Sequence, residues 1–85
     1  MGYKAVFTDE AIKDLDGLDK KILSRIVKKI KWFVKQNNPL NFAKRLQYEA
    51  IGQYRFRIGD YRVIFDCKEQ NIIVLRAGHR SIVYK

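Results

Sequence analysis

The sequence predicts an α+β domain of the order β-α-α-β-β-β, in which a helical hairpin packs on one face of a small, antiparallel-rich sheet. Three observations indicate this class. Residues 8–36 place apolar side chains at helical spacing, residues 54–67 alternate like a β-hairpin, and residues 72–77 form a further apolar run. With 85 residues and no repeats, residues 1–85 are expected to form a single domain.

The first elements are a short strand and a short helix. Residues 3–7, YKAVF, read as the strand. Thr8 is a suitable helix N-cap, and Asp9 and Glu10 suit the positive end of the helix dipole. Apolar residues then recur at helical spacing: Ala11, Ile12, Leu15 and Leu18.

A second helix is expected to start at Asp19 and to carry one continuous apolar stripe. The stripe consists of Ile22, Leu23, Ile26, Val27, Ile30, Phe33 and Val34. Asn37-Asn38-Pro39 should end this helix, because a residue before proline avoids the helical conformation. A connection follows over residues 38–53, with strand character around Leu46–Tyr48.

The hairpin over residues 54–67 contains the densest run of arginines, YRFRIGDYRVIF. Gly59-Asp60 can form a two-residue turn because Gly tolerates positive φ. That turn sets Arg57 opposite Arg62 and puts both on one face with Arg55. Like charges across a ladder are unfavourable, so an anionic group is expected there.

Composition points to a polyanionic partner and a reducing compartment. The chain has 18 Lys and Arg against nine Asp and Glu, a net charge of +9, which suits nucleic acid or an acidic protein. The single cysteine, Cys67, cannot form an internal disulfide, and the residues given predict neither a signal peptide nor a membrane-spanning apolar run. We therefore expect a cytoplasmic protein. One His and one Cys cannot assemble an ordinary zinc site, so no metal and no cofactor are expected.

The combination of the hairpin with the C-terminal segment GHRSIVYK resembles the RelE/ParE toxin superfamily over nearly the whole chain. The most specific part is R-x-R-x-G-D-Y-R followed by H-R-x-x-V-Y. This resemblance implies the toxin of a type II toxin–antitoxin system, neutralised by an acidic, RelB-like antitoxin. In the RelE branch such a toxin is an mRNA endonuclease in the ribosomal A site, whereas the ParE branch poisons DNA gyrase.

The resemblance also suggests site residues by matching motifs. Two basic residues before the turn, near the attacked phosphate, correspond to Arg55 and Arg57, and a phosphate clamp after the turn corresponds to Arg62. A C-terminal basic pair corresponds to His79 and Arg80, and the tyrosine that stacks on or orients a base of the codon corresponds to Tyr84.

This chain departs from RelE itself in carrying arginines where RelE has lysines on the first hairpin strand. Arginine stays protonated and is a poor general base. Histidine is the residue type suited to proton transfer near neutral pH, so His79 is the candidate for that role, as acid or base, with Arg80 as the alternative acid. Each candidate residue also has a non-catalytic interpretation. The arginines could form a solvated or antitoxin-facing patch, His79 could be structural, and Tyr84 could simply pack.

The second helix also has a basic face, which in this family meets ribosomal RNA or the antitoxin. With the residues beyond it, the expected RNA- and ribosome-binding set is Lys28, Lys29, Lys31, Lys35, Lys44 and Arg45. A membrane-surface role is disfavoured, because the apolar stripe of this helix is needed for the core.

The sequence thus predicts a ribosome-dependent mRNA endonuclease that acts on mRNA within the 70S ribosome by metal-free, in-line attack of the 2′-hydroxyl. A ParE-like gyrase inhibitor and a catalytically inactive module that binds antitoxin or RNA stay open. From the sequence alone, Arg62→Ala is expected to abolish toxicity and leave the fold intact.

Overall fold

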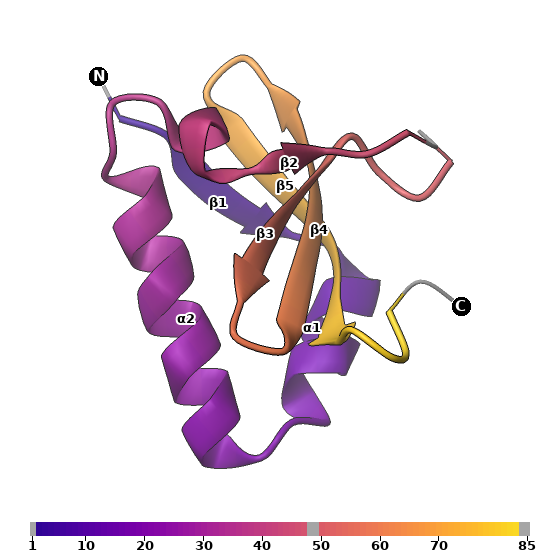
Figure 1. Ribbon diagram of the computed structural model, residues 1–85. Coiled ribbons are helices and arrows are strands. Elements are labelled where there is room, and N and C mark those ends of the chain that lie inside the picture. The colour runs from indigo at the N-terminus through magenta and orange to yellow at the C-terminus, as the bar shows by residue number, and fades with distance from the viewer. Residues whose placement is uncertain (1, 48–49, 84–85) are drawn as a thin grey trace.

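The computed structural model describes residues 2–47 and 50–83 and has the expected α+β architecture (Figure 1). Five strands form one sheet in the order β1-β5-β4-β3-β2. Their bounds are β1 Lys4–Phe7, β2 Lys44–Arg45, β3 Tyr54–Ile58, β4 Tyr61–Lys68 and β5 Asn71–His79. The sheet is antiparallel except where β1 pairs with β5 in parallel.

Two helices follow β1, as the apolar spacing predicts: α1 Asp9–Asp16 and α2 Lys20–Val34. The Thr8 hydroxyl accepts a hydrogen bond from the Ala11 N–H at 3.1 Å, so Thr8 is the N-cap of α1. Asp19 caps α2 in the same way by accepting from the Lys21 N–H at 3.3 Å. Neither helix is long and apolar enough to cross a bilayer, and no other helix in the described part of the chain is.

The core lies between the helices and one face of the sheet. Phe33 of α2 stacks on Phe56 of β3 with ring centroids 4.0 Å apart, and Phe56 stacks on Phe65 of β4 at 4.3 Å. All three rings are buried, together with Ile26 and Ile30 of α2. This aromatic stack packs α2 against the hairpin that carries the arginines. Removing any of its rings would leave a cavity and destabilise that contact.

The hairpin has the predicted register, with Ile58 opposite Tyr61 across the Gly59-Asp60 turn. Gly59 has φ +61°, a conformation that glycine adopts without strain. In Figure 1 this turn points to the same end of the molecule as the loop between the two helices. The hairpin therefore projects beside the N-terminal half of α2.

One strand was predicted in the wrong place. Strand character was expected around Leu46–Tyr48, but β2 comprises Lys44 and Arg45, and Tyr48 lies outside the described residues. A 3₁₀ helix at Pro39–Phe42 precedes β2, and Pro39 is its first residue. This short helix brings Lys44 beside β3 earlier than the hydrophobic pattern indicates.

Candidate functional site

Three arginines occupy the sheet face that points away from the helices. In β3 and β4, Phe56 and Val63 face the helical core, and alternation places Arg55, Arg57 and Arg62 on the opposite face. Arg57 pairs directly with Arg62, as predicted from the sequence. We call these three side chains the arginine face. Lys44 of β2 joins it, because Lys44 lies opposite Arg55 in the ladder.

The three arginines differ in burial, which the sequence does not indicate. Arg57 is exposed and Arg55 is half-buried, but Arg62 is only 7% exposed. The Arg62 guanidinium donates from Nη1 to the carbonyl oxygens of Gly59 at 2.9 Å and Tyr61 at 3.1 Å. Arg62 therefore also holds the hairpin turn, so the expectation that Arg62→Ala leaves the fold intact is revised.

The structure does not bring His79 together with the arginines. His79 lies opposite Tyr61 in the ladder, and their rings meet edge to face at 5.5 Å. Tyr61 packs against the helical core, and directly opposed residues share a face, so the His79 ring lies on the helix side of the sheet. A role for His79 in proton transfer stays a prediction, and its position opposes it.

Hydrogen bonds from Ser81 determine which nitrogen of the neutral His79 ring carries the proton. The Ser81 backbone N–H donates to His79 Nδ1 at 3.2 Å, and the Ser81 hydroxyl lies 2.8 Å from the same nitrogen. Because a backbone N–H can only donate, Nδ1 must accept, and the proton of the neutral ring is on Nε2. In this arrangement the outer nitrogen of His79 is a hydrogen-bond donor and not a general base.

Arg80 begins a turn that returns to the hairpin. The Arg80 N–H donates to the Asp60 carbonyl at 2.9 Å, which ties the C-terminal segment to the β3–β4 turn. The Arg80 side chain is exposed. Tyr84, the predicted base-stacking residue, lies outside the described residues.

The excess of positive charge comes from one stretch of the chain. Nine of the 18 Lys and Arg residues fall between Lys20 and Arg45, a stretch without Asp or Glu, and the other nine cations balance the nine acidic residues. We call residues 20–45 the basic flank. It includes all of α2 and ends in β2, where Arg45 stacks on Tyr54 with the guanidinium carbon 5.5 Å from the ring centroid.

A groove joins the basic flank to the arginine face. It has a volume of about 470 Å³ and is lined by Arg25, Lys28, Lys29, Trp32, Arg57, Ile58 and Gly59. Of the predicted RNA-binding residues, Lys28 and Lys29 therefore lie beside Arg57, while Lys31 and Lys35 are exposed elsewhere along the flank. Cations thus continue from α2 to the hairpin.

Sequence reasoning missed an aromatic pair on this flank. Trp32 is 42% exposed and Phe42 is 47% exposed, and their rings meet edge to face at 5.0 Å. The Lys29 ammonium lies 4.4 Å from the Trp32 ring centroid. Trp32 sits next to Phe33 and outside the apolar stripe of α2, and that position off the stripe is the signal that could have identified it.

A partly exposed ion pair links α1 to β5. The Asp14 carboxylate accepts from Arg76 Nε at 2.8 Å, from Arg76 Nη2 at 3.2 Å and from the Ala77 N–H at 3.0 Å. Burial alone would raise the pKa of Asp14, but these bonds and the charge of Arg76 together hold that pKa below its usual value. The same hydrogen bonds raise the pKa of Arg76.

Cys67 behaves as a structural residue. It lies half-buried in β4, as its place in the strand pattern predicts, and its Sγ contacts the Glu69 carbonyl at 3.6 Å. Burial raises the pKa of the thiol, which favours the unreactive protonated form.

Comparison with known families identifies the chain. Residues 5–84 match the family model described as the ParE toxin of the type II toxin-antitoxin system, parDE. The chain belongs to this toxin family. It is therefore a toxin of the RelE/ParE superfamily, as the hairpin and the GHR segment suggested.

Solved structures agree with this assignment. The toxin is 29% identical to a chain of the RelBE2 toxin–antitoxin complex from Mycobacterium tuberculosis, with a TM-score of 0.82, and the match covers 94% of the toxin and 100% of that chain. It is 27% identical to a chain of the RelB–RelE complex from Methanococcus jannaschii, with a TM-score of 0.72 and 93% and 94% coverage.

A third match is a chain of the archaeal RelE–RelB complex from Pyrococcus horikoshii, at 26% identity, a TM-score of 0.70, and 96% and 99% coverage. No curated protein matches the toxin. The fold and the superfamily are thus shared with chains from three toxin–antitoxin complexes.

Proposed function

We propose that this toxin is a ribosome-dependent mRNA endonuclease that cleaves the message in the ribosomal A site and stops translation. The arginine face is the observation that carries the proposal. Arg57 lies opposite Arg62, with Arg55 two residues away, so three guanidinium groups cluster on one face of the sheet. Guanidinium groups bind phosphate through paired, charge-assisted hydrogen bonds, so the cluster suits a scissile phosphate.

The chemistry needs no metal in this proposal. The 2′-hydroxyl attacks the adjacent phosphorus, the 5′-oxygen leaves, and negative charge builds on the non-bridging oxygens. Arg55, Arg57 and Arg62 stabilise that charge. Arg80 is the C-terminal cation of the site, because its backbone is bonded to the hairpin turn. Tyr84 is expected to stack on a base, as the family motif implies.

The basic flank supplies the second half of the proposal. Its nine cations and no acids favour binding to ribosomal RNA, and the contacts should weaken steeply with salt. A cognate acidic, RelB-like antitoxin would compete for the same cationic surfaces. The RelB–RelE complexes among the similar structures support this partner, and the toxin would act in the cytoplasm, where ribosomes are.

The test is induction of the toxin without an antitoxin, followed by mapping of mRNA 5′ ends. We expect new ends confined to translated codons, and a fall of about 100- to 1000-fold in cutting for Arg57→Ala, the effect of losing one transition-state donor. Arg57 is preferred to Arg62 for this test because Arg57 is exposed, whereas Arg62 is buried and donates to the carbonyls of the turn. Lys13→Ala, which removes a cation from α1, is the matched control.

Inhibition of DNA gyrase is the second candidate, and the match to the ParE toxin model favours it. Growth arrest with intact messages and DNA damage would support gyrase poisoning and reject the nuclease. Harmless expression would leave a module that only binds antitoxin or RNA.

A further inference from the structure

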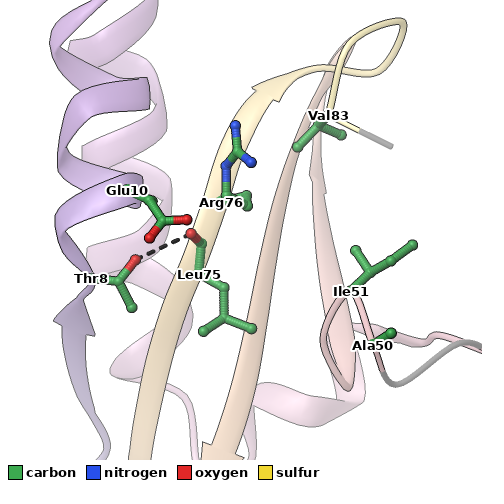
Figure 2. Close-up of a pocket in the computed structure, with 7 residues that line it drawn as sticks. All are labelled: Thr8, Glu10, Ala50, Ile51, Leu75, Arg76 and Val83. Carbon is green, nitrogen blue, oxygen red and sulfur yellow. Dashed lines mark hydrogen bonds between the residues drawn. The ribbon is translucent and has the colours of Figure 1, made fainter. Parts of the chain in front are cut away.

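A second cavity lies beside the arginine face, and the proposed chemistry does not use it. It has a volume of about 390 Å³ and is lined by Thr8, Glu10, Ala50, Ile51, Leu75, Arg76 and Val83. Figure 2 shows Thr8 and Glu10 from the start of α1 on one side, Ile51 and Ala50 across from them, and Leu75 and Arg76 of β5 between. The cavity is therefore built from segments far apart in the sequence.

Two glycine contacts place this cavity on the same sheet face as the arginines. Gly78 lies opposite Arg62, and a β-carbon on Gly78 would lie 3.9 Å from Val83 Cβ. The C-terminal turn thus folds back over the arginine face. Leu75 is three residues before Gly78 in β5, which is a distance of about 10 Å along the strand.

The loop before β3 forms the opposite wall in the same way. A β-carbon on Gly52 would lie 2.5 Å from Ile64 Cγ2 and 3.0 Å from Leu75 Cδ1. Ile64 is the ladder partner of Arg55, so the loop rests on the arginine face next to that residue. An RNA strand with a phosphate on the arginine face would therefore find this cavity about 10 Å away along β5.

The polar groups of the cavity are mostly engaged, with two exceptions among the hydrogen bonds of the described residues: Arg76 Nη1 and the Glu10 carboxylate. The Thr8 hydroxyl donates to the Leu75 carbonyl at 3.1 Å and accepts from the Ala11 N–H. Arg76 uses Nε and Nη2 to bind Asp14, which leaves Nη1. Glu10 accepts no hydrogen bond from the described residues, and Figure 2 shows its carboxylate directed toward β5.

These groups define the ligand by chemistry. The Glu10 carboxylate, whose charge also acts on Arg76, repels phosphate and can accept from two adjacent N–H donors, while Arg76 Nη1 can donate to an acceptor beside them. The apolar walls formed by Ile51, Leu75 and Val83 suit a flat ring. Guanine presents N1–H and N2–H next to the O6 acceptor on its Watson–Crick edge, whereas adenine and cytosine offer a single amino group there.

We propose that this cavity is a nucleobase subsite that selects guanine next to the scissile phosphate, with Glu10 as the specificity-determining residue. Glu10 accepts from N1–H and N2–H, and Arg76 donates to O6. The phosphates stay on the arginine face. The inference rests on the proposed nuclease function, because it assigns the base specificity of that same site.

The first test compares cleavage positions for the wild type, Glu10→Gln and Asp9→Asn. Gln has the size of Glu but offers an amide donor where guanine needs an acceptor. We expect Glu10→Gln to lower the preference for guanine beside the cut by about tenfold or more, the discrimination of one bidentate base contact. Asp9→Asn removes the same charge from the same helix turn, does not line the cavity, and should keep the wild-type preference.

The second test uses binding and does not depend on cleavage. Methyl NMR signals of Ile51, Leu75 and Val83 are followed while guanosine or adenosine 5′-monophosphate is added. Shifts with the guanine nucleotide alone, lost in Glu10→Gln, are expected. Equal shifts with both nucleotides, no shift, or an unchanged cleavage preference in Glu10→Gln would overturn the subsite. Guanine-selective shifts in a toxin that cuts no message would reject the nuclease and keep the subsite.

Discussion

Replacing Arg62 with alanine should destabilise the toxin, because this arginine is part of the hairpin as well as of the candidate site. Arg62 is 7% exposed and donates two hydrogen bonds to the carbonyls of Gly59 and Tyr61. Hydrogen bonds from a charged group contribute about 1.5 kcal/mol or more each, so Arg62→Ala should lower the free energy of unfolding by about 3 kcal/mol. In a domain of this size that corresponds to a fall in melting temperature of about 12–24 °C.

The assay is thermal and urea unfolding of Arg62→Ala beside Arg57→Ala. Arg57 is directly opposite in the ladder but exposed, so its replacement should change stability by less than about 0.5 kcal/mol. The pair separates loss of fold from loss of chemistry in any toxicity assay. If the two variants melted within about 2 °C of each other, the structural role given to Arg62 would be refuted.

Three further predictions concern the ion pair, the glycine loop and the basic flank. Asp14→Asn should lower the free energy of unfolding by about 1–2 kcal/mol near neutral pH. Because folding lowers the pKa of Asp14 below 3.8, this difference from wild type should be complete above the unfolded pKa and should vanish as pH falls through the folded pKa. Urea unfolding of both proteins across pH 2–7 measures it. Gly52→Ala should cost about 1–3 kcal/mol, because Gly52 has φ +151° and a β-carbon would lie 2.5 Å from Ile64 Cγ2; an unchanged melting temperature would contradict this. Lys28→Ala should reduce the salt dependence of ribosome binding by about 0.7–0.9 in log–log slope, whereas Lys13→Ala on α1 should leave the slope unchanged.

The sequence predicts features that depend on neighbouring residues, such as the hairpin register. It does not predict side-chain burial or cavities that depend on how the chain folds back on itself. The hairpin register follows from a two-residue turn and alternation, so the pairing of Arg57 with Arg62 is predictable. The burial of Arg62 depends on how its guanidinium folds back onto the turn carbonyls, which no spacing rule contains. The same is true of the cavity beside Leu75, whose walls come from four separate segments.

His79 shows how a strand end can mislead. The strand was expected to stop at Ala77, which would leave His79 free to turn toward the arginines. In the structure β5 continues to His79, so alternation keeps this side chain on the face of Ala77, toward the helices. The extension follows from pairing with Tyr61 and from the Arg80–Asp60 hydrogen bond, and both are long-range contacts.

With His79 on the other side of the sheet, the arginine face needs a different group to remove the 2′-hydroxyl proton. Guanidinium groups stay protonated, but a lysine amine can exchange a proton. Lys44 is exposed and lies opposite Arg55. Strand β2 therefore adds a lysine to the arginine face, to which β3 contributes only arginines as cations.

Under the proposed nuclease function, Lys44→Arg should therefore keep the charge and RNA binding but reduce cleavage by about 100-fold, the share of one general base. Lys31→Arg, on the exposed side of α2, is the matched control and should cut at the wild-type rate. Full cleavage by Lys44→Arg would exclude Lys44 as the base. It would then follow that the arginine face only stabilises charge, and that the ribosome must supply the group that accepts the proton.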